Sequence, residues 1–209
     1  HCYDALVGLA GCDKSLPGLM MAMCRLNVPS VFIYGGSILP GRYKGNDVTV
    51  VDVFEAVGKY AAGGTTEEDL NELERVACPS AGACGGQFTA NTMACVSEVI
   101  GLALPYSSGA PAPYEERDKY AYESGKQIMY LIENNIRPRD IVTRKSLENA
   151  ATIVAATGGS TNAGLHLPAI ANECGIEFTL DDVVEIFKKT PYIADLKPGG
   201  QFVAKDVYE

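Results

Sequence analysis

Residues 4–34 decide the fold class, and they read DALVGLAGCDKSLPGLMMAMCRLNVPSVFIY. The apolar runs over 4–10 and 30–34 predict two β-strands, whereas 15–26 has the apolar spacing of a helix. A strand, a helix and a second strand usually form a parallel pair with a right-handed crossover, because the helix must return to cover the sheet. The sequence therefore predicts an α/β fold, a parallel sheet flanked by helices in an α/β/α sandwich.

The remainder of the chain predicts mostly helices. Amphipathic spacing predicts a helix over 50–61, and Thr65 with Glu68 forms a capping box that would open the next one. Further helical patterns cover 87–104, 114–134, 143–156, 163–174 and 180–189, with caps at Thr143 and at Thr179 with Asp182, and an irregularity at Pro168. The C-terminal half is thus expected to be helix-rich, without internal repeats or a domain linker.

Composition and charge exclude several classes of function. The 209 residues are 47% hydrophobic and carry a net charge of −9. This composition is typical of a soluble globular protein that repels nucleic-acid phosphates and anionic membranes, and no apolar run approaches the roughly eighteen residues of a membrane span. The chain begins at His1 rather than at a methionine, and residues 205–209 contain no closing element, so we expect an internal fragment of a longer protein.

The seven cysteines are irregularly spaced, which indicates a reducing compartment where some thiols bind metal. Cys24 and Cys95 lie on apolar faces of predicted helices and Cys174 ends one, so all three are expected to be inert. Cys78 precedes Cys84 by a spacing that fits neither a Cys-x-x-Cys hook nor a zinc ribbon, and we interpret it as structural.

The turn Gly11-Cys12-Asp13-Lys14-Ser15 follows the first strand and precedes the first helix, where open α/β sheets bind ligands. Cys12 is a candidate soft thiolate ligand, Asp13 a candidate hard oxygen ligand and Lys14 a cation. The structural alternative is that these polar residues only cap the following helix.

Cys84 lies between the loop CPSAGA at 78–83 and the helical pattern that starts at Gln87. We expect it at a helix N-terminus, where its sulfur would gain thiolate character, with Gly85 and Gly86 permitting the close approach of a bulky cofactor. The alternative is a buried apolar thiol.

Two glycine-containing segments are weaker candidates. The segment GGSTN at 158–162 would offer free backbone N–H groups as an anion cradle at a helix start. His166, one helical turn beyond it, is expected to be a satisfied structural histidine. Gly35-Gly36-Ser37 either lines a ligand cleft or forms a tight turn.

Three motifs in order carry a family resemblance. Gly11-Cys12-Asp13-Lys14 followed by Pro17-Gly18 resembles the cluster-and-magnesium motif of the dihydroxy-acid and phosphogluconate dehydratase family. CPSAGACGGQFTANTM at 78–93 resembles the family's second cluster segment, and GGSTN at 158–162 with His166-Leu167 resembles a third stretch. The resemblance covers essentially the whole chain, and it implies that 1–209 is part of the N-terminal cluster- and magnesium-binding domain of a longer dehydratase, the C-terminal domain being absent.

The resemblance also implies residue roles. Cys12 and Cys84 would be two of three cysteine ligands of an iron-sulfur cluster, and Asp13 and a carboxylated Lys14 would hold magnesium at the catalytic centre. A further cysteine and an acidic magnesium ligand would lie upstream of His1, and a serine base and a glutamate ligand would lie in the C-terminal domain. Some members with a four-iron cluster carry a cysteine where this chain has Ala81, which favours 2Fe-2S over 4Fe-4S.

The implied activity is that of a hydro-lyase of branched-chain amino-acid biosynthesis, which removes water from 2,3-dihydroxy-3-methylbutanoate and its methylpentanoate homologue to give 2-oxo acids. The segment 83–93 reads like the dihydroxy-acid branch, and sugar-acid or 6-phosphogluconate dehydratases are the nearest alternative. A second alternative is a non-catalytic thiol- or zinc-binding module, and the fragment alone is expected to be inactive. The family implies a cytoplasmic homodimer, organellar in a eukaryote, with neither nucleic acid nor membrane as a partner.

Overall fold

A parallel two-stranded sheet with a helical crossover organises the N-terminal part of the chain. The structure, a computed structural model, describes residues 2–209. Strand β1 (Leu6–Ala10) pairs in parallel with β2 (Ser30–Tyr34), and helix α1 (Ser15–Leu26) connects them. The predicted strand, helix and strand are therefore confirmed, in one continuous register from Leu6 opposite Ser30 to Ala10 opposite Tyr34.

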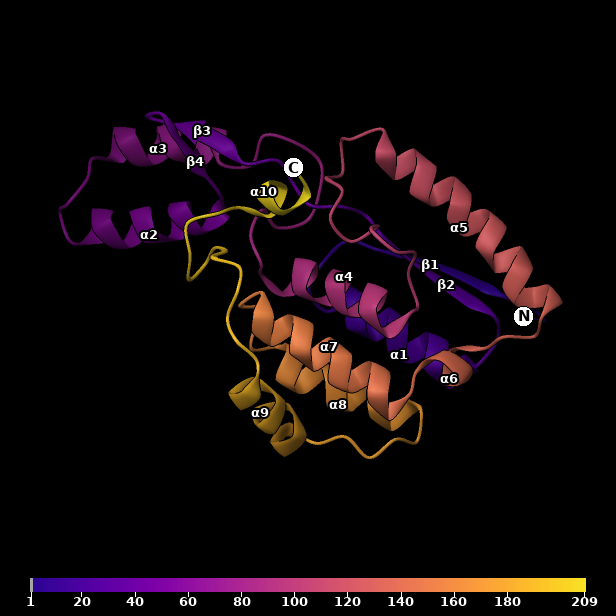
Figure 1. The fold of residues 1–209 in the computed structure, drawn as a ribbon. Coiled ribbons are helices and arrows are strands. Elements are labelled where there is room, and N and C mark those ends of the chain that lie inside the picture. Colours follow the sequence, from indigo (N-terminus) through magenta and orange to yellow (C-terminus); the bar gives the residue numbers. More distant parts are fainter. Residues whose placement is uncertain (1) are drawn as a thin grey trace.

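Helices cover both faces of this sheet, as Figure 1 shows. Successive residues of β2 pack against helices on opposite faces of the sheet, because the side chains of a strand point alternately to either face. Val31 packs with Ile128 and Leu131 of α5 (Glu116–Glu133), whereas Phe32 and Tyr34 belong to the main core on the other side. The α/β/α arrangement is confirmed, with a smaller sheet than a doubly wound fold would have.

Helix α1 approaches β1 very closely at Gly8. A Cβ atom at this position would lie 2.4 Å from Met23 Cε and 2.5 Å from Leu19 Cδ2. Only glycine allows this separation of helix and strand. The close contact determines where the start of α1, and hence the turn 11–15, lies relative to the strand end.

The main core is helical and contains α1, α4 (Thr89–Ile100), α7 (Arg144–Ala156) and α8 (Ala163–Glu173), with α9 (Leu180–Lys189) packed outside. Its fully buried large side chains include Leu16, Met20, Met93, Leu147, Leu167 and Ile170. Two short helices, α6 (Pro138–Ile141) and α10 (Ala204–Tyr208), complete the chain. Beyond β4 the part of the chain that the structure describes has no further strand, so the helix-rich C-terminal half is confirmed. None of the helices within residues 2–209 has the length and apolar character needed to span a bilayer.

A separate small lobe consists of the hairpin β3 (Gly41–Tyr43) and β4 (Asn46–Val48) with helices α2 (Val50–Ala61) and α3 (Glu67–Val76) (Figure 1). Its own core joins Val48, Ala56, Leu73 and Ala77. The hairpin is absent from the sequence-based prediction. Its signal is the dipeptide Lys44-Gly45, where both residues have positive φ, the backbone of a primed two-residue turn.

Two of the three predicted helix caps are confirmed by hydrogen bonds. Thr143 accepts from the Ser146 N–H at 3.1 Å, and Thr179 and Asp182 form a reciprocal capping box. The predicted box at Thr65 and Glu68 is wrong by one residue, because Thr66 caps α3 by accepting from the Asp69 N–H at 3.1 Å. The Asp69 carboxylate also binds Tyr43 and Lys44 of the hairpin, so a tertiary contact selects this register.

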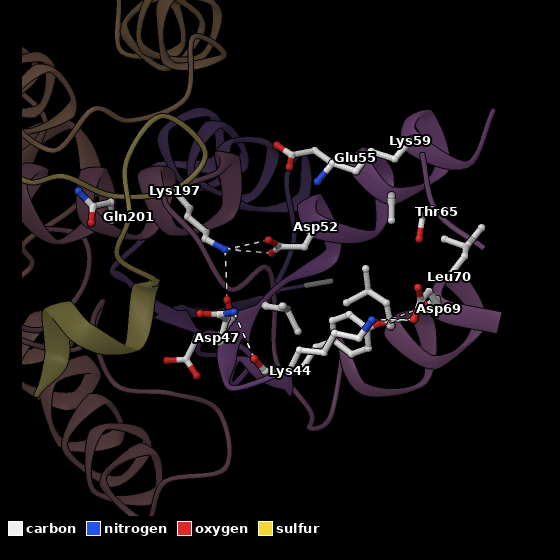
Figure 2. A pocket seen from close by; sticks show the side chains of 15 residues that line it. Lys44, Asp47, Asp52, Glu55, Lys59, Thr65, Asp69, Leu70, Lys197 and Gln201 are labelled. Atoms are coloured by element: carbon white, nitrogen blue, oxygen red, sulfur yellow. Dashed lines mark hydrogen bonds and ion pairs between the residues drawn. The ribbon is translucent and has the colours of Figure 1, made fainter. Parts of the chain in front are cut away.

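An ion pair ties the small lobe to the C-terminal segment. Lys197 Nζ lies 3.1 and 3.0 Å from the two carboxylate oxygens of Asp52 and 3.3 Å from the Asp47 carbonyl oxygen, as the dashed lines in Figure 2 mark. Asp52 also closes the capping box of α2, accepting from the Thr49 N–H at 2.6 Å. These contacts border a cavity of about 610 Å³ that none of the predicted site residues lines.

Five of the seven charged side chains that line this cavity have ionic partners within the chain, and the other two, Glu55 and Lys59, are exposed to solvent. Lys44 pairs with Asp69 at 2.7 Å and Arg42 with Asp47 at 2.6 Å, in addition to the pair of Lys197 with Asp52. A site that recognises a charged ligand needs charge that the protein has not neutralised itself. We therefore interpret the cavity as part of the lobe's attachment to the rest of the chain.

Asp52→Asn is expected to lower the free energy of unfolding by about 1 kcal/mol at neutral pH, since the helix cap and the partly buried ion pair both lose a charge. Partial burial raises the pKa of Asp52, but the Thr49 N–H and the Lys197 ammonium outweigh it and hold the pKa below its ordinary value. The contribution is therefore complete above the unfolded-state pKa and is lost as the pH falls below about 4.

Urea unfolding of both proteins between pH 3 and pH 7 measures this difference. Asp181→Asn, which changes an exposed first-turn carboxylate of α9, is the matched control and should be close to neutral. A wild-type advantage over Asp52→Asn that stays constant down to pH 3 would contradict the assignment.

Candidate functional site

The turn between β1 and α1 presents three chemically different side chains to the outside. Ser15 closes it, since its hydroxyl donates to the Cys12 carbonyl at 2.6 Å and accepts from the Cys12 N–H at 3.2 Å. The N-cap residue Lys14 makes no side-chain capping bond, and Asp13 pairs with Lys14 at 2.9 Å. The structural alternative, in which these residues serve as helix caps, is therefore wrong for Cys12, Asp13 and Lys14.

The loop that carries Cys84 is held against the end of β2. Ala83 donates from its N–H to the Gly36 carbonyl at 2.9 Å and accepts from the Ile38 N–H at 3.1 Å. Gly82 has φ +133°, and a Cβ there would lie 2.5 Å from Ile38 N. The glycine permits this close crossing of two loops, which places Cys84 beside the strand ends.

Asn91 links three elements through one buried amide group. Its Nδ2 donates to the Cys84 carbonyl at 2.7 Å and to the Gly86 carbonyl at 2.6 Å. Its Oδ1 accepts from the Tyr34 hydroxyl at 2.5 Å. Burial raises the pKa of Tyr34, which keeps its phenol protonated and able to donate. The side chain therefore joins α4, the Cys84 loop and the end of β2.

Arg117 supports the same corner from α5. It donates to the Tyr34 carbonyl, to the Ser107 carbonyl at 2.5 Å and to the Ala110 carbonyl at 3.4 Å. The sequence-based prediction included neither Arg117 nor Asn91 among its site residues. A signal exists for Asn91, which is a lone amide in the otherwise apolar or small-residue first turns of α4.

The predicted position of Cys84 at a helix N-terminus needs correction. Helix α4 starts at Thr89, so Cys84 lies in the loop before it, although the N–H groups of Ala90 and Asn91 in the first turn still reach its sulfur. Burial raises the pKa of Cys84, while these two N–H groups lower it, and burial prevails. Without a bound metal the neutral thiol is favoured, so the predicted thiolate character is wrong.

The two glycines after Cys84 pack against protein atoms. A Cβ on Gly85 would lie 3.2 Å from Thr49 Cγ2, and one on Gly86 would lie 2.8 Å from the Phe88 ring and 3.0 Å from the Lys197 carbonyl. These close protein contacts explain both glycines without a cofactor.

Cys12 and Cys84 face a common region at the carboxyl ends of the two strands. Charge on Cys12 contributes, after burial, to the raised pKa of Cys84, and charge on both sulfurs contributes to the raised pKa of Tyr34. Among residues 2–209 no three His, Cys, Asp or Glu side chains are grouped as a metal site. The two thiols could therefore contribute to a metal centre but could not complete it.

Three other cysteines occupy the kinds of position predicted for them. Cys24 is fully buried in the main core, Cys95 is partly buried and Cys174 caps the end of α8. Cys78, for which a structural role is predicted, is exposed on its loop.

The segment 158–162 docks onto the first turn of α4. Thr89 Oγ1 lies 2.9 Å from Ser160 Oγ and accepts from Asn162 Nδ2 at 2.8 Å, and the Ser160 N–H donates to Thr92 Oγ1 at 2.9 Å. Four backbone N–H groups of this segment already donate to acceptors within the protein, those of Gly158, Gly159, Ser160 and Asn162. The predicted anion cradle is therefore wrong, because these donors are already used. A cavity of about 330 Å³ remains between Gln87, Thr89 and Thr161.

His166 is buried in α8 with no hydrogen-bond partner for either ring nitrogen among the described residues. Burial lowers its pKa, the charge of Lys14 lowers it further and that of Asp13 raises it. The expectation of a satisfied structural histidine is therefore wrong. The imidazole lies close enough to the turn 11–15 for the charges of Lys14 and Asp13 to shift its pKa.

Gly35-Gly36-Ser37 does not form the tight turn that is one of the two expectations, because the segment runs from the end of β2 to an isolated parallel bridge between Ser37 and Ala83. Gly36 has φ +94°, and a Cβ there would lie 2.6 Å from Ala112 N. Ser37 is buried, and the Gly36 carbonyl accepts a hydrogen bond from the Ala83 N–H of the Cys84 loop. The segment therefore helps to hold that loop in place.

Comparison with known proteins gives consistent matches. The model of the dihydroxy-acid/6-phosphogluconate dehydratase N-terminal family matches residues 1–209. Similar curated proteins, each named dihydroxy-acid dehydratase, come from Pelagibacter ubique (81% identical over 208 residues), Parvibaculum lavamentivorans (78% over 209) and Sulfurisphaera tokodaii (54% over 208). Each alignment covers 100% of this chain but only 36%, 36% and 37% of those relatives, respectively.

Asn91→Ala is expected to lower the free energy of unfolding by about 2–4 kcal/mol, because a buried phenol, the buried Gly86 carbonyl and the partly buried Cys84 carbonyl lose their partner. The Cys84 loop should also open more often, so that alkylation of Cys84 by iodoacetamide accelerates about tenfold under native conditions. Urea unfolding and mass spectrometry of the Cys84 peptide measure the two effects.

Asn134→Ala is the control, since Asn134 is exposed and bonds only the Tyr130 carbonyl through its side chain. It should change stability by less than about 0.5 kcal/mol. Equal effects of the two substitutions would contradict the role of Asn91 as the link between loop and strand.

Proposed function

The chain belongs to the dihydroxy-acid/6-phosphogluconate dehydratase family, and on that basis we propose that it is the metal-binding N-terminal part of a dihydroxy-acid dehydratase, a hydro-lyase. The observation that carries the proposal is the identity of 72–81% with several relatives that bear this name, over the full length of this chain. Because the chain spans about 36% of those relatives, the activity would belong to the longer protein. Its substrates would be 2,3-dihydroxy-3-methylbutanoate and the methylpentanoate homologue, in branched-chain amino-acid biosynthesis.

The donor types in the chain fit the two groups that such an enzyme would hold. Cys12 and Cys84 are soft ligands suited to iron, and Asp13 is a hard oxygen ligand suited to magnesium. The fit is supported by the exposed turn, where the side chains of Cys12 and Asp13 do not cap the helix and remain available as ligands. The set is incomplete within this chain, which agrees with further ligands elsewhere in the longer protein.

When bound, the cluster and magnesium would supply Lewis acidity toward the substrate 3-hydroxyl and toward the carboxylate and 2-hydroxyl, respectively. The chain's own residues would position these groups. Lys14, adjacent to Asp13 and exposed, would hold magnesium through a carboxylated amine. The Asn91 bonds would keep Cys84 at a constant place, and the buried side of its loop would exclude water.

We further propose a 2Fe-2S cluster rather than 4Fe-4S, because this chain has Ala81 at the position where some members with a four-iron cluster carry a cysteine. The full protein would be a homodimer of the cytoplasm, or of an organelle in a eukaryote. The chain alone, with two of the cysteine ligands, would be inactive.

Two alternatives differ in what they require. A sugar-acid or 6-phosphogluconate dehydratase of the same family would use the same metal-binding residues, and the names of the similar proteins favour the dihydroxy-acid branch. A non-catalytic zinc module would need four ligands close together, and the grouping of side chains within 2–209 gives it no support.

Anaerobic turnover of the full-length protein with magnesium tests the substrate. We expect 2-oxo acid from 2,3-dihydroxy-3-methylbutanoate at a kcat/KM at least about a hundredfold above that for 6-phosphogluconate or a sugar acid. The opposite preference would retain the family mechanism and overturn the biosynthetic assignment.

Cys12→Ser in the full-length protein is expected to abolish cluster retention, because a serine hydroxyl is a poor ligand for iron. Acid-labile sulfide and visible absorbance should fall to background, while the far-ultraviolet circular dichroism is unchanged, since Cys12 is exposed and does not pack in the core. Cys78→Ser, at another exposed cysteine, should retain both signals. A brown, active Cys12→Ser protein would remove Cys12 from the ligand set.

A further inference from the structure

Two cysteines meet where α1 packs on α8, far apart in the sequence and away from the turn 11–15. The Cys24 and Cys174 thiols lie close enough to shift each other's pKa, and the residues next to them, Arg25 and Glu173, are in direct contact. Cys24 belongs to the main core and Cys174 packs against it as the C-cap of α8. Two packed helices therefore present one thiol each to the same point.

Charged contacts on either side hold the two helix ends together. The residue after Cys24 and the residue before Cys174 form a bidentate ion pair, with Arg25 Nε donating to Glu173 Oε2 at 2.9 Å. From α6, Arg139 donates through Nε to the Cys24 carbonyl at 2.9 Å and through its N–H to Asn27 Oδ1 at 3.1 Å. These bonds restrain both backbones, so the two sulfurs meet repeatedly in the same geometry.

The two thiols differ in access and in reactivity. Cys24 is fully buried, whereas Cys174 is partly exposed. The interaction with the Cys24 thiol lowers the pKa of Cys174, burial opposes it, and the nearby guanidinium of Arg139 lowers the pKa further. The same interaction and burial raise the pKa of Cys24. Cys174 is thus the thiol that a small oxidant reaches and that ionises first.

We propose that Cys24 and Cys174 form an oxidative modification site, at which hydrogen peroxide converts the thiol pair into a disulfide that links α1 to α8. The Cys174 thiolate attacks one peroxide oxygen, the O–O bond breaks, and sulfenic acid and hydroxide form. The Cys24 sulfur then attacks the sulfenic sulfur, and its proton leaves with the sulfenic hydroxyl as water. The two sulfurs lose two electrons, which reduce the peroxide to two molecules of water.

The geometry requires only a small movement. A disulfide brings the two sulfurs to about 2 Å, and rotation about the side-chain bonds of two neighbouring cysteines on packed helix ends can supply this approach. Cys24 lies ten residues beyond Lys14, which corresponds to about 15 Å along the helix. The modification therefore joins the far ends of the helices and is separate from Cys12 and Cys84.

Peptide mapping of the full-length protein tests the proposal directly. The protein is treated with hydrogen peroxide, free thiols are blocked with iodoacetamide, and the sample is digested with trypsin without reduction. Cleavage gives the peptides 15–25 and 146–188, each with a single cysteine. We expect a species whose mass equals the two peptides less two hydrogen atoms, and its loss after treatment with dithiothreitol.

Variants separate the two steps. In Cys24→Ala the linked species should be absent, and Cys174 should be trapped as sulfenic acid by dimedone. In Cys174→Ser the linked species should also be absent, and Cys24 should be recovered as a free thiol because peroxide does not reach this buried residue. Cys95→Ser, at another partly buried cysteine, is the matched control and should form the linked species at the wild-type level.

Oxidation in urea controls for chance pairing, and the yield of the 15–25 and 146–188 species should fall at least fivefold there, because the helices no longer hold the thiols together. Oxidation of native Cys174 to sulfinic acid without any linked species would overturn the proposal. Preferential linkage of Cys174 to a cysteine other than Cys24 would overturn it as well.

Discussion

The buried amide of Asn91 is the constraint on which the candidate site depends. A loop rich in glycine, such as 82–86, has no regular backbone pairing of its own, so its position must come from other bonds. Asn91 supplies two of them, to the Cys84 and Gly86 carbonyls, and is itself oriented by the Tyr34 hydroxyl. Since the bonds to Tyr34 and Gly86 are buried and the bond to Cys84 is partly buried, each is costly to break and together they hold the loop in one position.

The turn 11–15 is held by local hydrogen bonds rather than by contacts with distant segments. Ser15 and the backbone close the turn, so Cys12, Asp13 and Lys14 remain available although they precede a helix directly. One half of the site is thus held by buried hydrogen bonds and the other is presented by a short local turn. The Gly8 contact joins the two, because it sets the distance between α1 and the sheet.

The cysteines illustrate how environment decides the chemistry of one residue type. Cys12 is exposed, Cys84 is half-buried under the first turn of α4, and Cys24 is sealed in the core beside Cys174. Burial favours the neutral thiol, whereas helix N–H groups and a guanidinium favour the thiolate. The proposed metal binding and the proposed oxidative pairing therefore involve different thiols, and the two pairs lie at opposite ends of α1.

The sequence by itself determined the family, the strand, helix and strand over 4–34, and the caps at Thr143 and Thr179, because motifs, periodicity and capping act within a few residues. The proposed roles of Cys12, Asp13, Lys14 and Cys84 also came from motifs. Only the tertiary structure decided the shift of the α3 cap to Thr66, the used donors of 158–162, the unsatisfied His166 and the meeting of Cys24 with Cys174. Each of these depends on which distant segments come into contact, and local patterns of polarity carry no information about the partner.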